Sequence, residues 1–182
     1  MVMRKVIIFL LLVFTFQGNK LFAQEDVADS LTYVYDLLPE ETGKNLSMAY
    51  AELEPSVLAD INWLNNNPLG KNTEMSNDKS RFVLMWMSGS PDVSIRMDDR
   101  LITFQGAEPA VLMAYMMGWT KYSLENNYSN DPIYAAVAGI TNAVGFYEKN
   151  KKMLRKNKEL DKYGEMIRNH TLTRYVADIV TK

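Results

Sequence analysis

The sequence has 182 residues, of which 47% are hydrophobic and 23% charged, with a formal net charge of −2, one histidine and no cysteine. This composition is typical of one globular domain with a sizeable core, and it excludes disordered, collagen-like, coiled-coil and polytopic membrane proteins. The lack of cysteine excludes disulfides, thiolate metal sites, cysteine nucleophiles and a lipid-bearing N-terminal cysteine. A single histidine excludes sites built from two imidazoles, and no motif predicts a cofactor or a metal.

Residues 1–23 have the layout of a cleavable signal peptide. A basic start with Arg4 and Lys5 precedes an apolar run over 6–16 and a more polar stretch that ends at Ala23. The apolar run is too short to cross a bilayer, which takes about 20 residues. Leu21 stands where a small residue normally precedes the cut, so the cleaved bond is less well defined than export itself. We therefore expect a periplasmic or secreted protein that is not a lipoprotein, with residues 24–182 forming one soluble helical domain without a transmembrane segment.

Charge is unevenly distributed along the chain after residue 23. Residues 24–147 carry 7 basic and 17 acidic side chains, whereas residues 148–182 carry 10 basic and 5 acidic ones. An acidic body and a basic tail can contact each other within one chain or pair head to tail in a homo-oligomer. Because the total charge is negative and the chain is expected to be exported, nucleic-acid binding is not predicted.

Helical structure is expected in three stretches of the first half of the chain. Apolar residues recur at three- and four-residue intervals over 26–38, which indicates an amphipathic helix. A second helical pattern covers 46–65, with a break expected before Pro55 because proline is tolerated in a first helical turn rather than in an interior. The apolar run over 82–87 predicts a buried helix over 80–88, with Ser76, Asn77 and Asp78 as its N-cap residues.

The segment 92–104 contains the one strand-like pattern. Val93, Ile95 and Met97 alternate with polar residues, and Asp98 with Asp99 could turn the chain into a second strand over 101–104. The prediction is therefore a short hairpin near 92–104, leaning on the helices because two strands alone are marginally stable. The alternative is an extended segment that leads into a short helix near 100–104.

The second half of the chain is expected to be helical over 108–125, 131–150 and 157–179. The loop 126–130 is short enough to make the first two helices antiparallel neighbours. Gly118 and Gly139 lie inside these helices, where glycine lowers helix stability. Their presence therefore indicates that the two helices cross closely at these positions. Together these patterns predict an all-α protein, an irregular bundle or solenoid-like stack of about six helices with one short extended or hairpin segment.

Few side chains point to catalysis. His170 lies on a polar stretch without an orienting partner in the sequence. Asp98, Asp99 and Glu108 cluster near the non-helical region, and two carboxylates held about 5–10 Å apart could act on a glycan, with an aromatic side chain as the sugar platform. Acids are also frequent in turns and first helical turns without any function.

A basic segment joins the last two predicted helices. Its cations could bind an acidic protein face, lipid headgroups or an anionic glycan, or could simply be solvated; they are Lys149, Lys151, Lys152, Arg155, Lys156 and Lys158. The leading hypothesis is an exported, non-catalytic module for protein–protein or cell-envelope contacts that acts through these residues. The alternative is a glycan-binding or glycan-hydrolysing protein that uses Asp98, Asp99 and Glu108, and a buried apolar ligand among the methionine-rich helices is a third reading.

Overall fold

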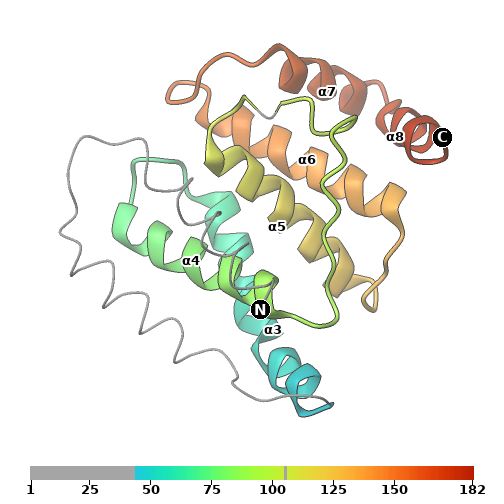
Figure 1. The fold of residues 1–182 in the computed structure, drawn as a ribbon. Helices are drawn as coiled ribbons and strands as arrows, with labels where there is room; N and C mark the ends of the chain where they lie inside the picture. Colours follow the sequence, from blue (N-terminus) through green and yellow to red (C-terminus); the bar gives the residue numbers. More distant parts are fainter. Residues whose placement is uncertain (1–43, 105) are drawn as a thin grey trace.

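The computed structural model describes residues 44–104 and 106–182, and this part of the chain is an all-α bundle (Figure 1). The predicted fold class is thereby confirmed. The signal peptide and the helix expected over 26–38 lie outside the described residues. The six helices of the described part are α3 (Lys44–Asn66), α4 (Thr73–Gly89), α5 (Pro109–Glu125), α6 (Pro132–Asn150), α7 (Lys158–Arg168) and α8 (Leu172–Val180).

Helix α6 is the centre of the bundle. It contacts α3, α5, α7 and α8, and its interface with α5 is the most extensive in the described structure. All six helices contribute to one continuous hydrophobic core, whose fully buried members include Ile61, Trp86, Tyr115, Ile140 and Leu160. Within the described ranges, no helix combines the length and the apolar character that a bilayer crossing requires.

The predicted antiparallel pair of α5 and α6 is confirmed. Asp131 caps α6 by accepting hydrogen bonds from the backbone N–H groups of Ile133 at 2.9 Å and Tyr134 at 3.2 Å. The two helices approach closely at both predicted glycines. A β-carbon on Gly139 would lie 2.7 Å from the Tyr115 ring, and one on Gly118 would lie 2.6 Å from the Ala138 carbonyl oxygen. The glycines therefore allow backbone contact that a larger residue would prevent.

Helix α3 continues through Pro55, so the break predicted there is wrong. Proline removes one intrahelical hydrogen bond and costs a helix interior about 3 kcal/mol. Tyr50 on one side of Pro55 and Val57 and Ile61 on the other are buried in the same core. Burial on both sides holds the two halves in one helix, because tertiary packing provides most of the stability of helices in proteins.

Helix α4 begins earlier than predicted. Its first hydrogen bond runs from the Ser76 N–H to the carbonyl of Asn72, a residue with the left-handed φ of 51°, so Ser76, Asn77 and Asp78 lie within the helix and do not cap it. The Lys79 ammonium lies 2.5 Å from the Asp60 carboxylate and over the Trp63 ring of α3. The apolar run marks only the buried part of α4, and these contacts hold its more polar beginning against α3.

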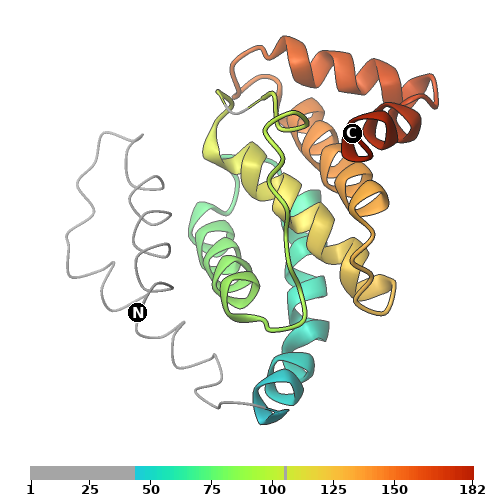
Figure 2. The same ribbon diagram turned by 45° about the vertical axis from the view of Figure 1, so that its right-hand side comes forward.

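Residues 92–104 form no hairpin, and no strand occurs in the described ranges. The first part of the segment is extended, as the alternative reading expected, and runs across α5 (Figures 1 and 2). After Asp98 the chain forms hydrogen-bonded turns: the Leu101 and Ile102 N–H groups both donate to the Asp98 carbonyl. Consecutive Leu101 and Ile102 are both buried, whereas a strand would turn one of them outward. Phe104 is buried as well.

The helix predicted over 157–179 is divided into α7 and α8 by a turn at His170, which has a φ of 56°. The Thr171 N–H donates to the Met166 carbonyl and the His170 N–H donates to the Ile167 carbonyl. This is a Schellman motif, in which one residue past the helix end takes a left-handed conformation. The turn lets both short helices pack on α6, and they bury Leu160 and Val176 in the core.

Candidate functional site

The segment between α6 and α7 is an ordered turn that presents cations to solvent. We call this turn together with Lys158, the first residue of α7, the basic loop (residues 151–158). It starts with hydrogen bonds from the Met153 and Leu154 N–H groups to the Asn150 carbonyl. The turn ends at Asn157, whose side chain caps α7 by accepting from the Glu159 and Leu160 N–H groups. The sequence therefore builds a defined surface between two helix ends.

Contacts to neighbouring elements hold the middle and end of the basic loop in place. The Arg155 N–H donates to Glu108 Oε1 at 3.1 Å, and the Asn157 N–H donates to the Tyr147 hydroxyl at 3.0 Å. Leu154 packs against the hydrophobic core. The loop backbone is thus anchored to α5 and α6 while its side chains extend outward.

The six predicted cations fall into two groups. Lys149 donates to the Asn65 carbonyl at 2.5 Å, and Lys151 lies 2.7 Å from Glu148 and 3.6 Å from Asp161. The Glu148 contact raises the pKa of Lys151, which keeps this amine charged. These two lysines therefore fasten α6 to α3 and to α7. The sequence alone did not separate them from the other four.

All six cations are exposed, and the second group has no comparably close side-chain contact within the described part of the chain: Lys152, Arg155, Lys156 and Lys158. The Arg155 side chain is 79% exposed and makes a single long contact, 3.9 Å, with Glu108. Met153 lies among them with 59% of its surface exposed, although its methyl group reaches Gly70 in the α3–α4 loop. The result is a protruding basic surface with a thioether in its middle.

The three predicted carboxylates lie on the segment between α4 and α5. Asp98 lies where the extended segment turns beside α5, Asp99 is exposed in that turn, and Glu108 lies before the first turn of α5 against the basic loop. None of them lines the described cleft between α5 and α6. Glu108 instead accepts the Arg155 backbone hydrogen bond, so its observed contact is with the loop that carries the cations.

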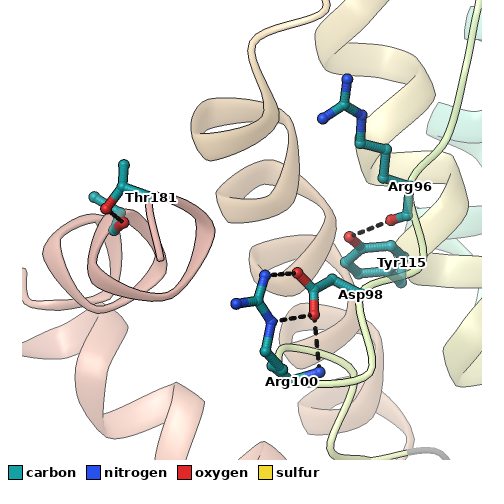
Figure 3. A network of polar contacts seen from close by, with 6 residues as sticks. Arg96, Asp98, Arg100, Tyr115 and Thr181 are labelled. Atoms are coloured by element: carbon teal, nitrogen blue, oxygen red, sulfur yellow. Dashed lines mark hydrogen bonds and ion pairs between the residues drawn. The ribbon is translucent and has the colours of Figure 1, made fainter.

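Asp98 is held as a carboxylate by its neighbour. Arg100 donates to it from Nε at 3.0 Å and from Nη2 at 2.7 Å, and this pairing lowers the pKa of Asp98 (Figure 3). A general acid for glycoside hydrolysis needs a raised pKa instead. The nearby Tyr115 hydroxyl donates to the Arg96 carbonyl at 3.1 Å, and burial raises the pKa of Tyr115. The Tyr115 bond therefore fixes the extended segment to α5, whereas the Asp98–Arg100 pair lies within the segment.

The three tryptophans offer little surface for a sugar. Trp86 is fully buried and Trp119 is 3% exposed, while Trp63 is partly covered and has Lys79 over its ring. Met87, Met113 and Met117 are likewise buried in the core. Among residues 44–104 and 106–182, no three acidic or histidine side chains are placed to hold a metal ion.

A cleft of about 540 Å³ lies between α5 and α6, with Asn65 of α3 at its edge. Asn142 on the cleft wall links three helices, because its amide donates to the Ala114 carbonyl at 2.7 Å and to Asn65 Oδ1 at 3.1 Å. Lys121 and Lys149 also line the cleft. Sequence reasoning missed this site, since nothing in the pattern of α6 shows that part of its small-residue surface stays uncovered.

Comparison with known proteins gives no identification: no family model, no curated protein and no solved structure matches the chain.

Proposed function

We propose that this chain is an exported, non-catalytic helical module that binds an acidic protein surface in the cell envelope through the basic loop. The single observation that carries the proposal is the exposure of Lys152, Arg155, Lys156 and Lys158 on a backbone that is already ordered. A preordered loop loses little conformational entropy on binding, so its charges contribute more fully to affinity.

An acidic protein face is the partner that fits this surface best. Arginine forms bidentate hydrogen bonds with carboxylates, and lysines beside it steer an oppositely charged partner during encounter. Met153 supplies an adaptable apolar contact in the middle of the charges, as methionine does at binding surfaces. The described carboxylates do not form an equivalent site, because Asp98 and Glu108 are engaged by Arg100 and by the basic loop.

Binding is tested with the chain from residue 24 as bait on a native envelope fraction. The captured protein is identified, purified and titrated by fluorescence anisotropy against the wild type and a variant with Lys152, Arg155, Lys156 and Lys158 all changed to Gln. We expect the variant to bind at least tenfold more weakly and to lose most of the salt dependence, since those charges are the proposed contacts.

A matched control removes the same charge elsewhere. Lys162, Arg168, Arg174 and Lys182 are exposed on or beside α7 and α8, and changing all four to Gln should leave the affinity within about twofold of wild type. If both variants weakened binding equally, the affinity would depend on net charge alone. That result would contradict the proposal that the basic loop is the binding site. If the wild type bound anionic phospholipid vesicles and no protein partner, the partner of the basic loop would be a membrane surface and not an acidic protein.

Export is tested separately. The full chain produced in a Gram-negative host should be recovered from the periplasm with residues 1–23 removed, as its intact mass would show. An uncleaved chain in the cytoplasm would contradict the export part of the proposal.

A further inference from the structure

The cleft between α5 and α6 is long enough to receive a helix. One wall follows a single face of α6 at three- and four-residue intervals, through Tyr134, Ala138, Thr141, Gly145 and Lys149. These residues extend over about 22 Å of helix axis at 1.5 Å per residue. A groove of this kind typically receives the apolar face of an amphipathic helix.

The groove exists because its floor lacks large side chains. Gly118 and Ala138 lie where α5 and α6 meet, and a β-carbon on Gly145 would have no atom within 4 Å. Tyr122, Val137 and Phe146 add apolar surface to the same cleft. Open space beside buried and half-buried apolar groups is available for an occupant that brings its own apolar side chains.

The charged groups of the groove favour an acidic occupant. Lys121 and Lys149 line it, and Lys149 lies at the end that continues into the basic loop. Glu125 is the one acidic lining residue, and it lies 3.8 Å from Lys121. Lys121 donates a hydrogen bond to the Asn62 side chain and Lys149 donates one to the Asn65 carbonyl, so both ammonium groups are fixed in position.

The chain contains a segment with the complementary properties. Residues 24–43 include no basic residue and six acidic ones: Glu25, Asp26, Asp29, Asp36, Glu40 and Glu41. Within this segment, Val27, Leu31, Val34 and Leu38 recur at helical intervals. A helix over 26–38 would be about 20 Å long, which matches the length of the groove.

The connection to α3 allows this segment to reach the groove of its own chain. Glu54 accepts a 2.5 Å hydrogen bond from Tyr128, in the loop that leads into α6 near Tyr134. Lys44 is ten residues before Glu54, which is about 15 Å of helix. Residues 39–43 span up to about 17 Å when extended, so a chain that turns back before Lys44 can bring residue 38 to the level of Glu54 and Tyr128.

We propose that residues 26–38 bind as a helix in the cleft between α5 and α6 of the same chain, with residue 38 near Tyr134 and Asp26 and Asp29 near Lys149. This inference goes beyond the proposed partner binding and does not depend on it. The orientation brings the acidic start of the segment to Lys149 and to the beginning of the basic loop.

The test uses the chain from residue 24 and a carbodiimide, which joins a carboxylate directly to an amine. Equal amounts of isotopically labelled and unlabelled protein are mixed and the cross-linked peptides are identified by mass spectrometry. We expect Asp26 or Asp29 to be joined to Lys149 or Lys152 within one chain. Joined peptides that combine labelled and unlabelled material would place the segment in a second copy and overturn the proposal.

Hydrogen exchange provides the second measurement. Gly145→Leu fills the open floor of the cleft, and Gly145→Ala is the small control at the same position. Exchange of residues 26–38 should be about tenfold faster in Gly145→Leu than in Gly145→Ala or wild type, because the segment is released. Equal exchange in all three proteins would overturn the proposal.

A variant in the segment itself removes any dependence on the folding of Gly145→Leu. Leu31→Asp should release residues 26–38 to the same degree while circular dichroism shows the thermal transition of the helical body retained. Unchanged cross-links from Asp26 and Asp29 in Leu31→Asp would also overturn the proposal.

Discussion

The ring of Tyr115 on α5 occupies the space that a side chain at Gly139 on α6 would need. A β-carbon there would lie 2.7 Å from Cε2 of the ring and 3.0 Å from the Tyr115 carbonyl oxygen. The ring cannot move aside easily, because its hydroxyl is bonded to the Arg96 carbonyl and Phe104 and Trp119 lie against it.

Gly139→Ala should therefore destabilise the protein by about 1–3 kcal/mol in urea unfolding, since a methyl group overpacks a rigid interface. Gly145→Ala is the matched control on the same helix, because its β-carbon meets nothing within 4 Å. It should raise stability by up to about 1 kcal/mol through better helix propensity. Equal effects at the two positions would contradict the close crossing at Tyr115.

Asn150 at the end of α6 fixes the α3–α4 loop. Its Oδ1 accepts from the Leu69 N–H at 2.7 Å, and its amide donates to the Phe146 carbonyl at 2.8 Å. Asn150→Leu should cost about 1–3 kcal/mol in urea unfolding because the Leu69 N–H loses its acceptor. Asn126→Leu removes a similar local bond, from an exposed side chain to the Tyr122 carbonyl, without a distant partner. It should cost less than about 0.5 kcal/mol.

His170 ends α7 in a left-handed conformation, which costs an L-residue about 1 kcal/mol relative to glycine. His170→Gly should therefore increase the free energy of unfolding by roughly that amount, and His170→Val should lower it because a β-branched residue tolerates positive φ poorly. Chemical denaturation of the two variants decides the sign. A loss of stability in His170→Gly would show that the imidazole, rather than the backbone turn, is what the site needs.

Tyr128 gives the protein a sensitivity to alkaline pH. Its hydroxyl donates to Glu54, and this bond together with desolvation raises the pKa of Tyr128 to about 12. A raised pKa means that the folded state favours the protonated phenol, so the contribution is complete below pH 10 and is lost as pH rises from 10 toward 12. The melting temperature of wild type should consequently fall more steeply over this window than that of Tyr128→Phe. Parallel curves would show that Glu54 does not hold the phenol.

Local signals in the sequence predicted the starts of the two helices that begin with proline. Asp131 followed by Pro132 marks the start of α6, and Pro109 marks the start of α5, and both helices begin there. Helix ends set by tertiary contacts were missed. Pro55 is held inside α3 by burial on both sides. At His170 the chain turns, although the local sequence is equally compatible with a continuous helix.

The candidate site was predictable only in part. The concentration of cations near the end of α6 is visible in the sequence, and all six are exposed in the structure. The division between solvated cations and those that fasten helices depends on partners distant in sequence, such as Asn65 for Lys149. The cleft was not predictable, because small residues on α6 are equally compatible with a packed helix interface and with a surface that no other helix covers.

The central place of α6 has a consequence for synthesis. Helices α3, α4 and α5 precede it, yet α5 has its most extensive contact with α6, and α7 and α8 pack on the same helix. During vectorial synthesis, the apolar face of α5 stays uncovered until residue 150 has emerged from the ribosome, and exposed faces of this kind promote aggregation and chaperone binding. A chain truncated before α6 is therefore expected to aggregate more readily than the chain that includes α6.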